Sequence, residues 1–162
     1  MLAPAVNDYM MMFRKPGVSD PLVKCLYDAK KNPDGWVTTE EWIRWASGVW
    51  SDIQEIDTLD GWRTGRAEKD EKHVCPLQLE PVRRCVALYT NPGELVLDPF
   101  MGIGSVAWVA LGGSTIQGRL EKPRRALGFE LKDTYHALAE KNLARLVRER
   151  EEQEAGLLAK GA

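Results

Sequence analysis

Features that mark several classes of protein are scarce in this sequence. Its 162 residues include only three cysteines, none of them in a CxxC pair, which argues against a disulfide framework and against a cysteine-based zinc motif. No apolar run approaches the about 20 residues that cross a bilayer, and the run at residues 9–13 is too short for the core of a signal peptide. These absences favour a reducing, cytoplasmic setting and no membrane partner.

An excess of charge of one sign is also missing. The chain has 22 basic and 24 acidic residues and a net charge of −2 at pH 7, so it lacks the strong positive field of a highly basic nucleic-acid binder. Any contact with DNA must therefore come from a local patch. The best candidate is a basic cluster that follows Trp62, formed by Arg63, Arg66, Lys69 and Lys72. Acidic residues interleave with this cluster, so a solvated loop is the alternative.

The pattern of apolar residues predicts an α/β fold in the second half of the chain. Helical spacing appears over residues 82–89 and 135–146, and a short apolar helix is expected at 104–111. Residues 95–97 and 126–129 are predicted to be buried strands. Helices that alternate with strands over short connections indicate a parallel sheet.

The first half of the chain is less regular. Residues 9–13 are predicted to be a buried strand, and residues 18–72 an irregular insertion that contains five of the six tryptophans. One short helix is expected there, because Thr38 with Glu41 forms a capping-box pattern and Gly48 gives a stop signal. The tryptophans are interpreted mainly as packing residues. At the other end, residues 151–162 are predicted to be a fraying helix end or a loose tail.

A cofactor-binding loop is predicted at residues 98–105, which read DPFMGIGS between a strand and a helix. Gly102 and Gly104 allow a sharp turn and a close approach of the backbone to a ligand, and the start of the next helix offers free N–H donors. Glu130 ends the neighbouring strand, where its carboxylate can accept hydrogen bonds from both hydroxyls of a ribose. The ligand should therefore carry a ribose and an anionic group.

Two other interpretations of this loop remain open. The glycine pair could form only a tight turn, or the GxGxxA pattern of residues 102–107 could bind a nicotinamide dinucleotide. Dinucleotide loops usually pass from the strand to the first glycine without an acidic residue and a proline between them. Because Asp98 and Pro99 stand there, S-adenosylmethionine is the favoured cofactor.

Three segments in this order, residues 71–79, 96–105 and 126–132, resemble the C-terminal half of the N6-adenine or N4-cytosine DNA methyltransferases, most of all the phage-borne members. The resemblance implies a partial class-I (Rossmann-like) methyltransferase sheet with a tryptophan-rich insertion. It also implies site-specific methylation of DNA at an exocyclic amino nitrogen, more often adenine N6 than cytosine N4. Proteins of this kind serve restriction-modification in the cytoplasm of a bacterium or a phage-infected host.

The resemblance also implies roles for individual residues and regions. The methionine part of the cofactor would be held by Asp98, Phe100, Gly102, Gly104 and Ser105. The ribose would be held by Glu130, and the segment that closes over the cofactor would contain His73, Pro76 and Gln78, where many relatives have lysine at the last position. Four regions follow: a terminal strand of a catalytic half at 1–17, a variable and possibly target-recognising segment at 18–72, an S-adenosylmethionine-binding subdomain at 73–150 and an acidic tail at 151–162.

The acceptor loop of this family has no counterpart in the sequence. The family grips the target amino group with an Asp/Asn/Ser-Pro-Pro-aromatic loop, yet no Pro-Pro pair occurs in this chain, so no catalytic residue is assigned. The chain is expected to be truncated and inactive alone. Activity would need a separate N-terminal half, and either that half or a second copy of the chain would cover its unpaired strand edge. The alternative is a non-catalytic remnant or subunit that binds cofactor or DNA.

No metal site is predicted. Residues 30–41 partly match a calcium loop, but Lys30 stands where the first carboxylate ligand is needed. A turn at residues 32–35 that leads into the capped helix is the preferred interpretation. His73 and the cysteines lack zinc spacing.

Overall fold

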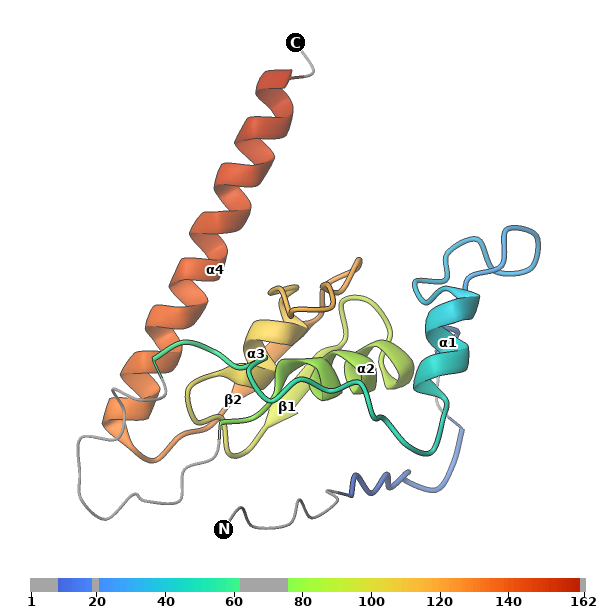
Figure 1. Ribbon diagram of the computed structural model, residues 1–162, viewed down its shortest axis with the longest axis horizontal. Helices are drawn as coiled ribbons and strands as arrows, with labels where there is room; N and C mark the ends of the chain where they lie inside the picture. Colours follow the sequence, from blue (N-terminus) through green and yellow to red (C-terminus); the bar gives the residue numbers. More distant parts are fainter. Residues whose placement is uncertain (1–8, 19–20, 62–75, 161–162) are drawn as a thin grey trace.

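The computed structural model describes residues 9–18, 21–61 and 76–160 (Figure 1). Its elements, in chain order, are α1 (Thr39–Trp45), α2 (Leu79–Tyr89), β1 (Leu95–Asp98), α3 (Ser105–Ala110), β2 (Arg125–Gly128) and α4 (Asp133–Lys160). Within the described residues β1 and β2 form a two-stranded parallel sheet. The predicted α/β fold class and parallel pairing are therefore confirmed.

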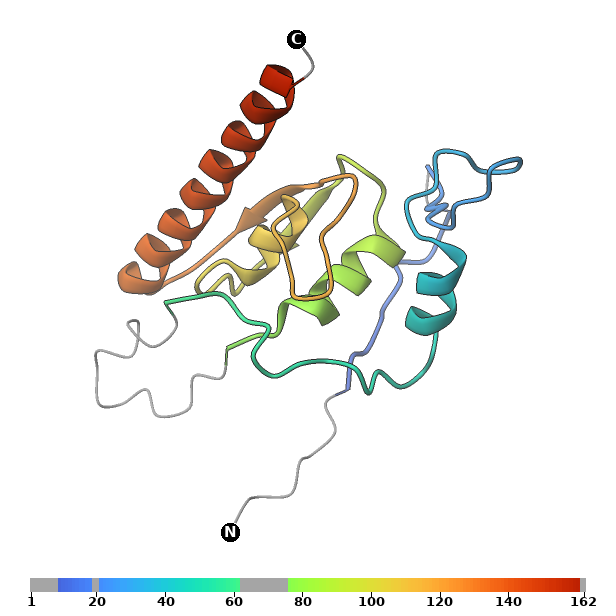
Figure 2. The same cartoon turned by 45° about the horizontal axis from the view of Figure 1, so that its top comes forward.

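The sheet and its helices bring three separate segments to one edge. Leu95 pairs with Arg125 at one end of the sheet, and Asp98 pairs with Gly128 at the other. Helix α2 reaches β1 through a tight turn and runs in the opposite direction to it (Figure 2). The start of α2, the loop after β1 and the loop after β2 consequently lie at the same end, the carboxyl edge of the sheet.

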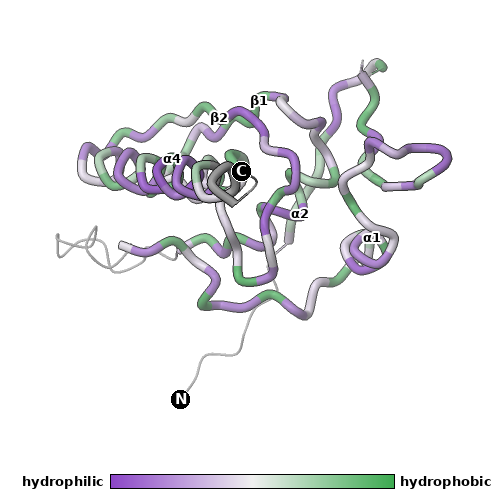
Figure 3. The backbone as a smooth tube through the Cα atoms, turned by 90° about the horizontal axis from the view of Figure 1, so that it is seen from above, coloured by the Kyte–Doolittle hydropathy of each residue, from purple (hydrophilic) through white to green (hydrophobic). Residues whose placement is uncertain are grey.

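The hydrophobic core lies on one side of the sheet. Helix α3 contacts both strands, α2 and α4. Figure 3 shows the two strands at the margin of the molecule, with α2 and α4 on one side of them. The fully or nearly buried apolar residues of this core are Val37, Trp45, Leu59, Leu79, Val86, Ala87, Trp108, Val109, Leu120 and Leu146.

The other face of the sheet is exposed, and no residue of either strand is fully buried, so the prediction of two buried strands is wrong. Exposed and half-buried residues alternate along both strands. Leu95, Leu97, Leu127 and Phe129 are 48–58% exposed. A parallel sheet is normally covered on both faces, and within the described part of the chain helices cover only one. We call these four residues the apolar sheet face.

The prediction of a strand at residues 9–13 is also wrong. Residues 9–13 form no strand, and their side chains are exposed, because no neighbouring strand pairs with them. Arg124, directly before β2, is buried. Its guanidinium lies 5.0 Å from the ring of Trp36 and donates to Thr90 Oγ1 at 2.9 Å. This burial lowers the pKa of Arg124 to about 10.

The helix predicted in the insertion is confirmed. Thr38 Oγ1 accepts a hydrogen bond from the Glu41 backbone N–H at 3.1 Å, and Glu41 Oε2 accepts one from the Thr38 N–H at 3.0 Å. At the far end of the chain α4 continues to Lys160. Residues 151–160 are thus part of this helix and not a loose tail.

Several tryptophans pack as expected. Trp45 and Trp108 are buried in the core. Trp36 and Trp50 donate their indole N–H groups to the carbonyl oxygens of Ala87 and Trp45, at 2.8 and 3.0 Å.

Candidate cofactor site

The loop that follows β1 is tied to the end of β2. The Phe129 N–H donates to the Asp98 carbonyl at 2.9 Å, and the Met101 N–H donates to the Phe129 carbonyl at 2.8 Å. Asp98 also turns its own chain, because its Oδ1 accepts from the Phe100 N–H at 3.0 Å. These bonds continue the pairing of the two strands into the loops at the carboxyl edge.

Two glycines in this loop adopt a conformation that other residues avoid. Gly102 has φ of 54° and Gly104 has φ of 91°, both in the left-handed region. A Cβ on Gly104 would lie 3.3 Å from Cβ of Ala139 in α4, whereas a Cβ on Gly102 would meet nothing within 4 Å. The loop is therefore packed against α4 at Gly104 and open at Gly102.

The Glu130 side chain lies over the open part of the loop. Its Oε2 accepts from the Gly102 N–H at 2.7 Å, and its Oε1 accepts from the Lys132 N–H at 2.9 Å. A carboxylate can accept about four hydrogen bonds, so each oxygen keeps capacity for another donor. The sequence predicted that Glu130 and the glycine loop would be neighbours, and the structure places them in direct contact.

The remaining loop residues differ in their exposure. The Phe100 side chain is 87% exposed at the tip of the loop. Ser105 is buried at the start of α3. The N-cap residue of that helix is Gly104, which has no side chain to occupy the free N–H groups. Phe100 is thus free to contact a ligand, while Ser105 can do so through its backbone.

Two residues that sequence reasoning missed hold the loop in place. Asn142 of α4 is buried, and its Nδ2 donates to the Ile103 carbonyl at 3.0 Å. Gly128 makes room for Met101, because a Cβ there would lie 2.4 Å from Met101 Sδ. The sequence feature that could have predicted the role of Asn142 is its position as an amide side chain within the apolar stripe of residues 135–146.

The other predicted site residues belong to the segment that leads into α2. His73 and the basic cluster Arg63, Arg66, Lys69 and Lys72 lie outside the described residues. Pro76 and Gln78 precede α2 at the carboxyl edge, and Gln78 makes no side-chain bond to the helix that it caps. Their contact with a cofactor stays a prediction.

The predicted cofactor residues differ in burial: Phe100 is exposed, Gly102 and Glu130 are partly exposed, and Gly104 and Ser105 are buried. Two cavities, of about 230 and 270 Å³, are lined by other residues. The glycine loop, the Glu130 carboxylate and the Phe100 ring together offer close backbone approach, hydrogen-bond acceptors and an aromatic surface. This set fits a cofactor that carries a ribose at one end and an amino acid at the other.

Residues 30–41, which partly match a calcium loop, form hydrogen bonds with nearby groups of the chain. Asp28 Oδ1 accepts from the N–H groups of Lys30 and Lys31, both at 2.8 Å, and Asn32 donates to the Lys24 and Leu26 carbonyls. Among the residues that the structure describes, no group of three or more His, Cys, Asp or Glu side chains could hold a metal ion. None of the helices found there is both long and apolar enough to cross a membrane.

A glycine loop after one parallel strand, with an acidic residue after its neighbour, defines an α/β protein of the Rossmann-like class. The sequence model of the N6/N4-type DNA methylases, described as DNA methylase, matches residues 3–141. The chain therefore belongs to this family of DNA methyltransferases.

Individual relatives agree with this assignment. The type II methyltransferase M.BglI of Bacillus subtilis is 29% identical over 137 residues, which cover 84% of this chain and 30% of the relative. M.MjaI of Methanocaldococcus jannaschii is 25% identical over 138 residues, which cover 84% and 38%. The chain thus spans about a third of the length of these curated relatives.

A solved structure is also similar. A putative DNA modification methylase from Thermus thermophilus, crystallised in complex with S-adenosyl-L-methionine, shares 30% sequence identity at a TM-score of 0.45. The match covers 67% of this chain and 33% of the Thermus protein.

Proposed function

We propose that this chain is the cofactor-binding part of an S-adenosylmethionine-dependent DNA methyltransferase that modifies an exocyclic amino nitrogen, adenine N6 more often than cytosine N4. The observation that carries the proposal is the contact of the Glu130 carboxylate with the Gly102 amide at the carboxyl edge. It brings a ribose acceptor within reach of a backbone that is open to a ligand. Family membership supports the same cofactor.

Each site residue has a distinct task in this proposal. S-adenosylmethionine, when bound, supplies an electrophilic methyl group on a sulfonium. Glu130 accepts hydrogen bonds from the ribose hydroxyls, and the backbone around Gly102 receives the amino-acid end. The exposed Phe100 ring can face a positively charged ligand group. Pro76 and Gln78, with His73, would cover the cofactor from the α2 side.

The target base and the DNA contacts belong to the same proposal. Residues 18–72 would recognise the target sequence, and the basic cluster within them would contact phosphates. The acceptor grip would come from a separate catalytic half, because a second copy of the chain would also lack the Pro-Pro-aromatic loop. The rival interpretation, a non-catalytic subunit or remnant, is favoured by the absence of a Pro-Pro pair in the sequence.

Calorimetry with S-adenosylmethionine and with NAD tests the choice of cofactor. We expect the chain to bind S-adenosylmethionine more tightly, because the Asp98-Pro99 start of the loop leaves no clear cradle for a pyrophosphate. Glu130→Gln should weaken this binding by roughly 1.5 to 3 kcal/mol, the contribution of a charge-assisted hydrogen bond. Tighter binding of NAD would show that the proposed cofactor is wrong, and full affinity in Glu130→Gln would show that Glu130 does not hold it.

The apolar sheet face supports a protein partner on that side. The outer edges of β1 and β2 are also unpaired within the described residues, and unpaired edges favour association. We expect the isolated chain to self-associate in size-exclusion chromatography. Leu97→Lys with Leu127→Lys should shift it towards a monomer, because both charges would enter the contact.

The control for this experiment places the same charges elsewhere. Ile43 in α1 and Val147 in α4 are similarly exposed, at 66% and 51%. Lysine at both positions should leave the association unchanged. A monomeric wild-type chain, or equal effects of the two double variants, would refute a docking role for the apolar sheet face.

A further inference from the structure

Helix α2 is capped by a residue from another part of the chain. Asp57, only 3% exposed, accepts from the Leu79 N–H through its backbone oxygen at 2.7 Å and from the Glu80 N–H through Oδ2 at 3.1 Å. Free N–H groups at a helix start are normally satisfied by the cap residue of that helix, which here is Gln78 and makes no such bond. Asp57, which belongs to the insertion, caps the helix instead.

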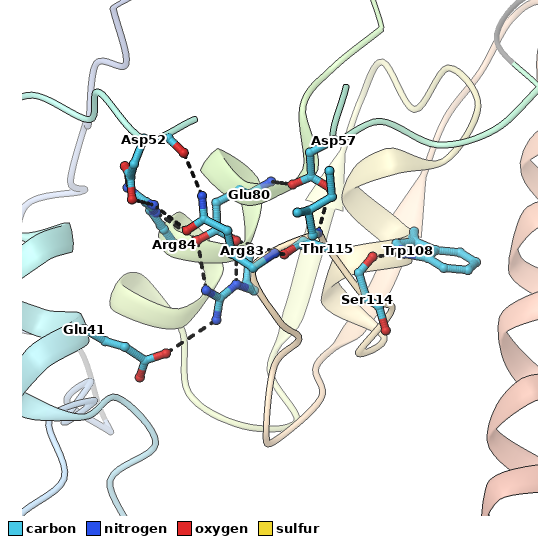
Figure 4. Close-up of polar contacts among 11 residues, drawn as sticks. Glu41, Asp52, Asp57, Glu80, Arg83, Arg84, Trp108, Ser114 and Thr115 are labelled. Carbon is cyan, nitrogen blue, oxygen red and sulfur yellow. Dashed lines mark hydrogen bonds and ion pairs between the residues drawn. The ribbon is translucent and has the colours of Figure 1, made fainter. Parts of the chain in front are cut away.

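Asp57 also holds a third segment. Its Oδ1 accepts from the Ile116 N–H at 3.0 Å, in the connection between α3 and β2. Figure 4 shows Asp57 beside Glu80, in the first turn of α2, and next to Thr115. One buried carboxylate therefore joins the insertion, the start of α2 and the loop that follows α3.

A buried ion cluster surrounds this junction (Figure 4). Glu80 accepts from Arg83, Arg84 and Thr115 at 2.7 to 2.9 Å. Arg84 in turn donates to both carboxylate oxygens of Asp52, at 2.9 and 2.7 Å, and this contact lowers the pKa of Asp52. Glu80 and Arg84 are fully buried, and such charges require complete pairing. The cluster therefore fixes residues 52–57 to α2.

The start of α2 is placed at the carboxyl edge by the antiparallel course of α2 and β1 (Figure 2). Pro76 and Gln78 immediately precede it, on the edge that also carries Glu130. Asp57 fixes the first turn of α2. It therefore also fixes the position at which residues 76–78 enter the helix. A change at Asp57 would move this segment relative to the glycine loop.

We propose that Asp57 is a positioning residue for the cofactor, which acts by capping α2 from within the insertion. The proposal rests on the proposed S-adenosylmethionine site. It assigns to the insertion a role in cofactor affinity in addition to any role in target recognition. Asp57 itself need not touch the cofactor.

The first test compares Asp57→Ala and Asp57→Asn with Asp60→Ala. Asp60 lies three residues further along, and its side chain is 89% exposed, so its removal is a matched control. The Kd is measured at a temperature where circular dichroism shows that all variants are folded. Asp57→Ala should raise the Kd for S-adenosylmethionine about tenfold, because a tenfold change in Kd corresponds to the free energy of about one helix cap. Asp57→Asn, which keeps one acceptor oxygen, should recover part of the affinity, and Asp60→Ala should match the wild type.

The second test needs no variant and applies even if Asp57→Ala fails to fold. In wild-type chain, S-adenosylmethionine should slow amide hydrogen exchange at Leu79, Glu80 and Ile116 as well as in the loop at 98–105. Two results would contradict positioning by Asp57 and leave the proposed function standing. In the first, the wild type binds the cofactor but the exchange of these three amides does not change. In the second, the Asp57 variants bind the cofactor as tightly as Asp60→Ala. If the wild type does not bind the cofactor at all, both proposals are wrong.

Discussion

Gly104→Val is expected to lower the affinity for S-adenosylmethionine by about 10- to 100-fold, which corresponds to backbone strain of about 1–3 kcal/mol at one residue. The φ of 91° is unfavourable for any side chain and most of all for a β-branched one. The added Cβ would also lie 3.3 Å from Ala139 Cβ, so the loop has to move away from α4. Isothermal titration calorimetry measures the change.

Gly93→Val is the matched control for this substitution. Gly93 has φ of 75°, and a Cβ there would meet nothing within 4 Å. It lies in the turn before β1, at the opposite end of the sheet from the loop. Both variants should lose stability through backbone strain, but only Gly104→Val should lose cofactor affinity. Equal affinities in the two variants would mean that the glycine loop does not hold the cofactor.

The isolated chain is expected to transfer no methyl group to DNA above background. Binding the cofactor positions the donor, yet no Pro-Pro-aromatic loop is present in the sequence to hold the acceptor amino nitrogen in line with it. Alignment of two reactants contributes on the order of 7 to 11 kcal/mol to such a step. Transfer of tritium from labelled S-adenosylmethionine to mixed-sequence DNA measures the activity.

Activity should appear when an N-terminal segment that carries an Asp/Asn/Ser-Pro-Pro-aromatic loop is supplied from a close relative. Two controls identify its source: the same segment with alanines in place of the two prolines, and the Gly104→Val chain with the intact segment. Both mixtures should stay near background. Robust methylation by the isolated chain would show that an acceptor site has been overlooked.

The parts of the fold that depend on local sequence were predictable. The capping box of α1 and the positive φ values at Gly102 and Gly104 follow from residues that are close together in the chain. The contact of Glu130 with the glycine loop followed from one further rule, that parallel strands end at the same edge. Local chemistry and one rule of topology therefore gave most of the candidate site.

The burial of charged and apolar groups was not predictable in the same way. Glu80, Arg84 and Asp57 look like solvated side chains in the sequence. The pairing of Glu80 with Arg84 is local, but nothing local shows that further partners more than 20 residues away bury these groups. Short apolar runs such as residues 95–97 suggested burial on both faces. Whether a face is covered depends on elements elsewhere in the protein, which the local pattern does not describe.

The remote cap of α2 limits how freely the insertion can be exchanged between methylases. A graft that replaces residues 18–72 with the corresponding segment of another methylase would remove Asp52 and Asp57 together with the segment proposed to recognise the target sequence. Arg84 would then be left without its bidentate partner. Because Arg84 is buried but the Asp52 side chain is 39% exposed, we expect a cost of about 1–3 kcal/mol, that of a buried donor left unsatisfied. A chimera with new specificity would therefore have to keep these two aspartates, or change Glu80 and Arg84 along with the graft.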